Sequence, residues 1–398
     1  MVDNLCDALQ ALDVENVFVY VGDAVRWDYL PGEIASEGTV VRTVAASIHS
    51  PPSFASLATG RYPPSHGVFS FSNRVHSDVP TLFEMDEYQT RFLNSVHEKS
   101  GNVDPIYSVL RERPPNVKNP FEDLSSPFVV MERGPGGHAP YDRTFSAADR
   151  YFSQNHETNQ IRTEYRGAIQ EDADKFQRRL TSLEEEGLLD DTLVIYTSDH
   201  GELLGEGGAV GHNAPMRPEL IWVPTVFVHP SLDTETLHED IIRHVDVFPT
   251  ILEVLCVPFE ETDFDGVALG RAAPPSIGLS FYRNRVLPEN IPFLSGKLAY
   301  EGAWDRSGGF VFARTHKAER LAALAGKAAK SPKRHYLRSH PYAVLRSYLE
   351  DDVQYGNPSF SKSGAEEVIT NASQDSCVRQ TVDIGEEAEQ HLRDLGYL

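Results

Sequence analysis

A serine at residue 50 stands where a helix is expected to begin, and a hydroxyl in that place could attack an ester. Pro51 and Pro52 suit the extended lead-in and the first turn of a helix, and Gly60 suits its end. Unpaired backbone N–H groups and the positive end of a helix dipole would then lie beside Ser50. This pattern predicts an anion site that contains a nucleophile.

Two aspartates follow short apolar runs that are typical of buried parallel strands. Asp23 comes after residues 17–22, and Asp199 with His200 comes after residues 192–197. The carboxyl ends of parallel strands share one edge of a sheet, where ligands collect. These side chains could therefore hold a divalent cation, with the Ser50 oxygen completing its shell. Taken alone, Asp23 could equally be a turn or cap residue.

Two further histidines lie in glycine-containing segments. His138 follows the apolar run 128–132, and His212 lies in Gly-His-Asn at 211–213. An imidazole that faces a dianion is favoured as a cation, so each could stabilise the substrate or donate a proton to the leaving oxygen. The alternative for both is an ordinary loop histidine with its hydrogen bonds satisfied.

The elements that must position these residues alternate between strand and helix. The stretch 161–189 has helical periodicity, with apolar residues at 169, 176, 180 and 183, and the segments 128–132 and 223–228 look like further strands. A helix is expected from residue 246. Pro274 and Pro275 mark a boundary. Beyond it, residues 317–338 predict a solvated helix followed by a loop, and 391–398 a short amphipathic helix.

Composition excludes several classes of function. With 36 basic and 59 acidic residues among 398, the net charge of −23 repels nucleic acid and anionic membrane. It suits a halophilic protein in a salt-rich cytoplasm or an ordinary acidic cytosolic enzyme. Three scattered cysteines predict buried thiols rather than disulfides. No apolar run is long enough to span a bilayer and no export signal is visible, so the expected location is cytoplasmic.

The segment around Ser50 resembles the signature of the sulfatase branch of the alkaline phosphatase superfamily, Cys/Ser-x-Pro-x-Arg-x-x-x-x-x-Gly-Arg, often followed by Tyr-Pro and His-Gly. Asp23, Arg26 and Asp28 are similar to the Asp-x-x-Arg-x-Asp opening of that family, and residues 198–202, Ser-Asp-His-Gly-Glu, to its second acidic motif. One position departs from the pattern, because Phe54 stands where the family has the Arg that braces the nucleophile. The matching residues of the first signature are Ser50, Pro52, Ser53, Ala55, Ser56, Leu57, Thr59, Gly60, Arg61, Tyr62, Pro63, His66 and Gly67.

This resemblance, of haloarchaeal sulfatase-like type, implies an α/β fold: an alkaline-phosphatase-like three-layer sandwich with a large central, mostly parallel sheet. Residues 1–273 would form the catalytic domain, and 274–398 a smaller C-terminal subdomain packed on it. One or two divalent metal ions (Ca²⁺, Mn²⁺ or Zn²⁺) would be implied, and imidazole ligation favours Mn²⁺ or Zn²⁺ over Ca²⁺. The implied metal ligands are Asp23, Ser50, Asp199 and His200, and the implied catalytic residues are Ser50, His138 and His212.

The expected activity is metal-dependent hydrolysis of a sulfuric or phosphoric ester through a covalent intermediate on Ser50, or on formylglycine made from it. The substrate would be a small-molecule or glycan sulfate or phosphate ester. A phosphorylated serine can be hydrolysed at phosphorus, whereas a sulfated one lacks the easy release that the formylglycine diol provides. Phe54 also replaces the Arg that maturation systems generally recognise, which disfavours formylglycine.

Two alternatives differ in class. One is a transferase of the phosphoglycerol or phosphoethanolamine type, in which an acceptor alcohol replaces water at the same intermediate. The other is a non-catalytic metal-binding homologue that has lost the braced nucleophile, which the Phe54 departure suggests. Intact-mass analysis of the Ser50 peptide and nitrophenol release from aryl esters separate these possibilities.

Overall fold

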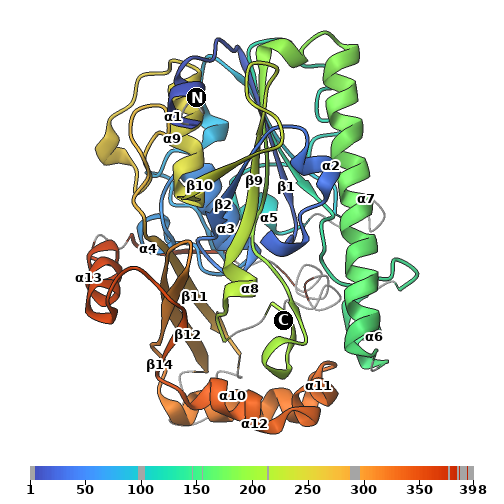
Figure 1. The fold of residues 1–398 in the computed structure, drawn as a ribbon, viewed down its shortest axis with the longest axis vertical. Helices are drawn as coiled ribbons and strands as arrows, with labels where there is room; N and C mark the ends of the chain where they lie inside the picture. Colours follow the sequence, from blue (N-terminus) through green and yellow to red (C-terminus); the bar gives the residue numbers. More distant parts are fainter. Residues whose placement is uncertain are drawn as a thin grey trace.

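A seven-stranded sheet forms the centre of the molecule (Figure 1). The computed structural model describes residues 5–96, 104–145, 147–154, 156–212, 215–286, 296–374, 377–382, 385 and 392. In this sheet β9 is antiparallel to both of its neighbours, and every other pairing is parallel, as expected from the sequence. The strands, in spatial order, are β10 (Thr236–Arg243), β2 (Thr39–Val44), β9 (Trp222–Val228), β6 (Thr192–Ser198), β1 (Asn16–Gly22), β5 (Phe128–Gly134) and β4 (Gln89–Asn94).

Helices cover both faces of this sheet, which gives the expected three layers. Alternate residues of β1 point to opposite faces. Val17, Val19 and Val21 pack in one apolar cluster with residues of α3 (Ser50–Thr59) and α9 (Val247–Val254). Phe18 and Tyr20 pack in another cluster with residues of α7 (Thr158–Glu185). Because β1 is fully buried on both faces, the site at its end is held by the rigid centre of the fold.

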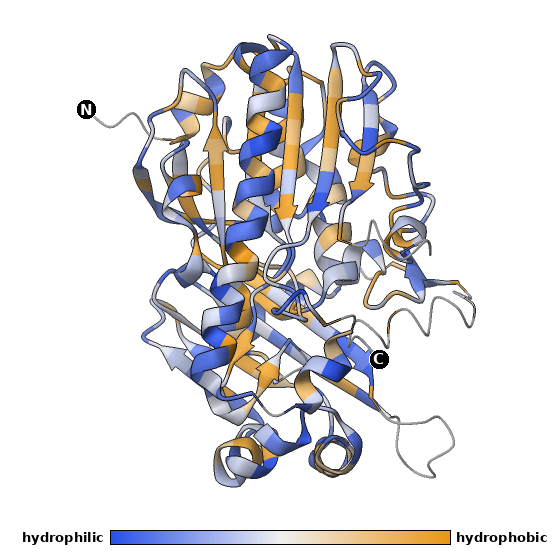
Figure 2. Ribbon diagram, turned by 90° about the vertical axis from the view of Figure 1, so that its right-hand side faces the viewer, coloured by the Kyte–Doolittle hydropathy of each residue, from blue (hydrophilic) through white to orange (hydrophobic). Residues whose placement is uncertain are grey.

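The long helix α7 confirms the helical periodicity predicted for residues 161–189. Ile169, Phe176, Leu180 and Leu183 are all buried. The last three pack against strands of the central sheet, whereas Ile169 packs against the loops beyond the strand ends. Figure 2 shows the outward face of this helix as mostly hydrophilic and the strands behind it as mostly hydrophobic. The helix is amphipathic, so burial of its apolar stripe against the sheet accounts for its position.

A second, antiparallel sheet follows the expected boundary near residue 273. It consists of β11 (Gly278–Arg285), β12 (Lys297–Trp304), β13 (Gly308–Ala313) and β14 (Asp352–Gly356). The Phe281 N–H donates to Ala46 O at 2.8 Å, and Ser280 Oγ donates to Ala45 O at 2.5 Å. These bonds fasten β11 to the segment that precedes Ser50. The division of the chain into domains at residue 273 stays a prediction.

The C-terminal helices correct one expectation. Residues 317–338 begin with a helix, α10 (Lys317–Lys330), but the predicted loop after it is wrong, because α11 (Arg334–Ser339) forms there. Tyr336 explains the difference: its ring is buried and its hydroxyl donates to His156 O at 2.8 Å, so a tertiary contact orders the turn. Two further helices follow, α12 (Pro341–Leu349) and α13 (Lys362–Ala372). The helix expected at 391–398 lies outside the described residues, apart from residue 392.

The three cysteines differ in how far they are buried. The expectation of buried thiols holds for Cys6 but is wrong for Cys256, which is exposed in a turn beyond the end of α9, and for Cys377, which is only partly buried. None of the helices described is both long and apolar enough to cross a bilayer.

The remaining helices and strands are short. They are α1 (Leu5–Gln10), α2 (Gly32–Ala35), α4 (Pro63–His66), α5 (Ile106–Val109), α6 (Ala148–Ser153), α8 (Pro218–Ile221), β3 (Asn73–Arg74), β7 (Leu203–Leu204), β8 (Val210–Gly211) and β15 (Gln380–Thr381).

Candidate active site

The carboxyl ends of β6, β1 and β5 bring distant residues to one edge of the central sheet. Gly22 at the end of β1 is in register with Ser198 of β6 and with Gly134 of β5. Asp23 and Asp199 therefore follow neighbouring strands at the same level, and both side chains are fully buried. The expected convergence of the two aspartates is observed.

Ser50 is the first residue of α3, so the helix begins slightly earlier than the proline pattern suggested. His49 precedes it in extended conformation, and the two prolines occupy the first turn. Ser50 Oγ lies 3.3 Å from His200 Nε2, and both residues are fully buried. The hydroxyl thus faces the strand ends from the amino end of a helix, where an anion is stabilised.

Asp23, Asp199 and His200 form a group that could hold a metal ion. One ligand atom from each lies within 4.8 Å of the other two. Asp199 Oδ1 accepts the N–H groups of Ala24 and His200, each at 2.9 Å, whereas its buried Oδ2 accepts no hydrogen bond from the described residues. Burial and the charge of Asp23 raise the pKa of Asp199. A buried carboxylate oxygen of this kind is what a bound cation would satisfy, so the residues fit a divalent ion.

The ring of His200 is oriented for that purpose. Its Nδ1 lies 2.9 Å from Gly201 O, and because a carbonyl oxygen only accepts, Nδ1 must carry the proton. Nε2 is then left with its lone pair toward Ser50 and Asp199. A second group of possible ligands, His200 with Glu202 and His212, uses the same histidine. A single ring nitrogen can ligate only one ion, so the two groups compete for Nε2.

Arg133, at the end of β5, is the main residue that sequence reasoning missed. Its Nη2 and Nε lie 2.5 and 3.1 Å from Asp23 Oδ2, and Nη2 also lies 3.4 Å from Ser50 Oγ. Burial by itself would raise the pKa of Asp23, but the Arg133 guanidinium together with the neighbouring histidines outweighs it and holds that pKa well below its usual range. The available signal was an arginine one residue beyond the apolar run 128–131, near the end of a buried strand.

His212 and His138, which were predicted to be catalytic, lie near His200. The ring centroids of His212 and His200 are 4.5 Å apart, and those of His212 and His138 are 5.3 Å apart. Burial lowers the pKa of His138 to about 4, and burial and neighbouring charges lower that of His212 well below its usual range, so both are neutral in the free protein at pH 7. The structure thus gathers all the predicted site residues, while their catalytic and metal-binding roles stay predictions.

Glu202 belongs to a motif noted in the sequence, but its contact with His212 was not foreseen. His212 Nδ1 lies 2.8 Å from Glu202 Oε2, and the Tyr141 hydroxyl donates to Glu202 Oε1 at 2.5 Å. An ionised Glu202 accepts the Nδ1 proton and leaves the lone pair of His212 on Nε2. The position of Glu202 two residues after His200 was the only signal available in the sequence.

The glycine loop after β5 packs directly on Asp23, and Asp172 of α7 holds it there. Gly136 has a φ of +48°, and a Cβ atom on it would lie 1.9 Å from Asp23 O. Asp172 Oδ1 accepts the Gly136 N–H at 2.8 Å and the Tyr20 hydroxyl at 2.8 Å. A Cβ at Gly22 would lie 2.8 Å from Asp172 Oδ2, so Gly22 leaves room for this carboxylate. The sequence signal was a charged residue on the buried stripe of a helix.

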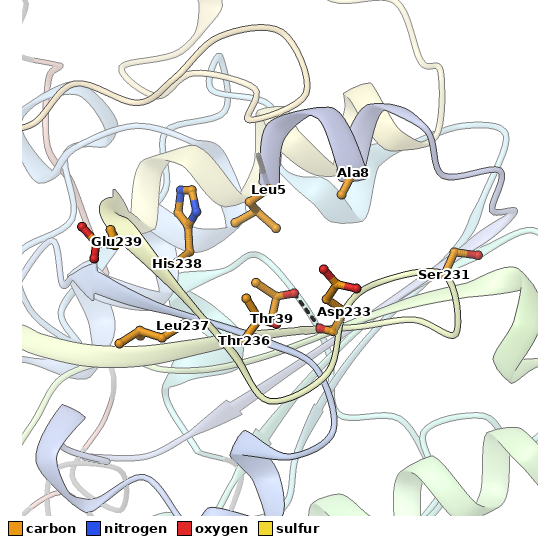
Figure 3. Close-up of a pocket in the computed structure, with 9 residues that line it drawn as sticks. All are labelled: Leu5, Ala8, Thr39, Ser231, Asp233, Thr236, Leu237, His238 and Glu239. Atoms are coloured by element: carbon orange, nitrogen blue, oxygen red, sulfur yellow. Dashed lines mark hydrogen bonds between the residues drawn. The ribbon is translucent and has the colours of Figure 1, made fainter. Parts of the chain in front are cut away.

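A separate cavity of about 450 Å³ lies at the opposite edge of the sheet (Figure 3). Thr39 and Thr236, which line it, are the first residues of β2 and β10, so it opens at the amino ends of the strands. Asp233 and Glu239 also line it, and none of the described residues that line it is an arginine or a lysine. These acidic groups would repel a sulfate or phosphate ester, so this cavity is not the ester site.

Comparisons with known proteins agree with this geometry. A family model described as Sulfatase matches residues 121–257. The chain is 30% identical to the low-salt glycan biosynthesis sulfotransferase Agl7 of Haloferax volcanii over 96% of each chain. Its fold is similar to that of the phosphonate monoester hydrolase of Agrobacterium radiobacter, at 16% identity with a TM-score of 0.57 over 86% of this chain and 100% of that one. It is also similar to a 2-O GAG sulfatase, BT1596, at 13% identity with a TM-score of 0.61 over 96% of each chain.

Proposed function

We propose that this chain, which belongs to the sulfatase family, cleaves sulfuric or phosphoric esters through attack by Ser50. The observation that carries the proposal is the 3.3 Å separation of Ser50 Oγ from His200 Nε2, beside Asp23 and Asp199. A nucleophile, cationic groups and proton-transfer groups meet there in a buried place. Ester cleavage by covalent catalysis needs all three.

In the first step, Ser50 Oγ forms a bond to phosphorus or sulfur, and the bond to the leaving oxygen breaks. The Ser50 proton must depart as this happens, and the lone pair that Glu202 leaves on His212 Nε2 gives it a place to go. The imidazolium formed in this way, on His212 or on His138 if that ring takes the Ser50 proton instead, can then supply the proton to the leaving oxygen. In the second step water or another alcohol attacks the seryl ester and releases Ser50.

The metal proposal rests on Asp23, Asp199 and His200, with Ser50 Oγ as a fourth donor. When bound, a divalent cation would lower the pKa of the Ser50 hydroxyl and neutralise the ester oxygens. The mixed set of carboxylate and imidazole ligands favours Mn²⁺ or Zn²⁺ over Ca²⁺. Titration of metal-free protein with each ion tests this order, and tightest binding of Ca²⁺ would refute it.

Nitrophenol release tests the activity. We expect 4-nitrophenyl phosphate or 4-nitrophenyl sulfate to be cleaved in the presence of Mn²⁺ and not after chelation. Metal binding without release from either ester would instead support the non-catalytic alternative. If sulfate is the preferred ester, the Ser50 peptide is expected to carry formylglycine, and its intact mass would show this.

Transfer to an acceptor alcohol is the second candidate. It is favoured by the name of the full-length relative, a sulfotransferase of glycan biosynthesis, and a glycan hydroxyl would then take the place of water. Adding an alcohol such as glycerol separates the two outcomes. A transferase raises nitrophenol release with acceptor concentration and yields a sulfated or phosphorylated acceptor, whereas a hydrolase yields the free anion.

A salt-rich cytoplasm remains the proposed environment. The net charge of −23 and a relative from Haloferax volcanii both support it. Salt screens repulsion between surface carboxylates, so the free energy of unfolding is expected to rise between low and molar KCl. Unfolding that is insensitive to KCl would argue for an ordinary acidic protein.

A further inference from the structure

We propose that Arg133, carried by β5, braces Ser50 and Asp23 in place of the arginine that α3 lacks at position 54. The proposal deepens the proposed function and rests on it, because it assigns Arg133 a part in the Ser50 reaction. In the sequence, Phe54 takes the place of the arginine that braces the nucleophile in the family signature. The structure supplies a guanidinium beside Ser50 from another element.

The contacts of Arg133 fix its guanidinium against both partners. Two of its nitrogens contact Asp23 Oδ2, at 2.5 and 3.1 Å, and Nη2 is 3.4 Å from Ser50 Oγ. Nη1 points the other way and lies 3.3 Å from Asp104 Oδ2. The side chain is only 1% exposed. A planar group held by two carboxylates has little freedom, so the nitrogen beside Ser50 has a fixed position.

Phe54 is built into this arrangement rather than being a simple loss. It lies one helical turn after Ser50, on the same side of α3. Its ring lies 5.4 Å from Arg133 Cζ and packs edge-on against Phe92 at 6.0 Å. The aromatic face therefore supports the guanidinium from below. An arginine at position 54 would meet the charge of Arg133 in the same buried space, so the two solutions exclude each other.

This placement gives Arg133 two effects on the reaction. Its positive charge beside Ser50 Oγ favours the alkoxide and the developing charge on the ester oxygens. Its contacts with Asp23 Oδ2 hold that carboxylate in place. The guanidinium also competes with a bound cation for the negative charge of Asp23. Removing the guanidinium should therefore slow turnover and tighten metal binding. Loss of a merely structural residue would lower both turnover and metal affinity, or would leave both unchanged.

The test compares Arg133→Gln with Arg179→Gln. Arg179 is a matched control because it also pairs with a buried carboxylate of β5, Glu132, at 2.8 and 2.9 Å, while lying on α7. In Arg133→Gln we expect the Mn²⁺ dissociation constant to fall about tenfold or more, because a charge repelled by the dication is gone. We expect kcat to fall about a hundredfold or more. Both quantities should stay near wild type in Arg179→Gln.

Two further variants keep the outcome decisive. Arg133→Lys retains the charge but loses the contact of two guanidinium nitrogens with Asp23. We therefore expect kcat to fall at least about tenfold, with Mn²⁺ affinity near wild type. Added guanidinium ion should restore part of the turnover of Arg133→Ala. Wild-type kcat in Arg133→Gln, or in Arg133→Lys if the first variant does not fold, would overturn the proposal, as would weaker Mn²⁺ binding in Arg133→Gln. If the wild type releases no nitrophenol, the proposed function fails, and the Mn²⁺ titrations still decide the placement of Arg133.

Discussion

Ser50 Oγ and His200 Nε2 lie 3.3 Å apart, although 150 residues separate them in the chain. The contact exists because the amino end of α3 meets the carboxyl end of β6, and both ends are buried by the core. The Ser50 hydroxyl thereby reaches the group formed by Asp23, Asp199 and His200. Each prediction below changes one part of this arrangement.

Replacing the nucleophile should separate catalysis from metal binding. Ser50→Ala is expected to abolish turnover while Mn²⁺ still binds to Asp23, Asp199 and His200, measured by nitrophenol release and metal titration. Ser53→Ala is the matched control, since Ser53 Oγ is buried in the same helix but bonds Ser47 O. It should cost about 1 kcal/mol of stability and leave turnover intact. Equal turnover in Ser50→Ala and wild type would remove Ser50 from the mechanism.

Neutralising Asp199 should weaken metal binding and turnover together. Asp199→Asn loses the charge on the oxygen that has no hydrogen-bond partner among the described residues, so we expect Mn²⁺ affinity to drop at least about tenfold. Turnover at low Mn²⁺ should drop with it and recover partly at high Mn²⁺. Asp191→Asn, at the exposed opposite end of β6, serves as control. Unchanged affinity in Asp199→Asn would exclude this carboxylate as a ligand.

Glu202 should act through His212. Glu202→Gln removes the charge that accepts the Nδ1 proton, so kcat is expected to fall about tenfold to a hundredfold. Tyr141→Phe keeps the carboxylate and loses one hydrogen bond, so its effect on kcat should be smaller. Nitrogen NMR of His212 should show Nδ1 protonated in the wild type. An Nε2-protonated ring would contradict the proposed orientation.

Asp172 should make stability depend on pH. Burial raises the pKa of Asp172 to about 6, above its value of about 3.9 in the unfolded chain. Its protonated form therefore stabilises the fold at low pH, and this contribution is lost as pH rises through about 6, by about 3 kcal/mol in all. The unfolding free energy of Asp172→Asn relative to wild type should rise by most of that amount, about 2 kcal/mol, between pH 4 and pH 7. A difference that is flat with pH would show that Asp172 titrates normally.

The framework of this site could be predicted because it follows from local patterns. Apolar runs that end in an aspartate identified β1 and β6, and the shared edge of parallel strands placed Asp23 near Asp199. The proline pair and Gly60 located α3. These signals depend on residues close together in the chain, which the sequence displays directly.

The bracing contacts could not be predicted because they join side chains across elements. Nothing in the sequence shows that Arg133 turns toward Asp23, since that depends on the β1–β5 register and on Phe54 filling the space below. The same holds for Asp172 of α7, whose carboxylate accepts the Gly136 N–H of the loop after β5. The desolvation cost of burying these charges is offset by partners that come together only in the folded chain.

Mass analysis of the Ser50 peptide after a rapid acid quench tests the central claim most directly. Protein mixed with 4-nitrophenyl phosphate or 4-nitrophenyl sulfate and Mn²⁺ is digested, and the peptide that spans α3 is sequenced by fragmentation. We predict that Ser50 gains the mass of one phosphoryl or sulfuryl group during turnover. Nitrophenol release with no such mass on Ser50, or with the group on another residue, would contradict the account.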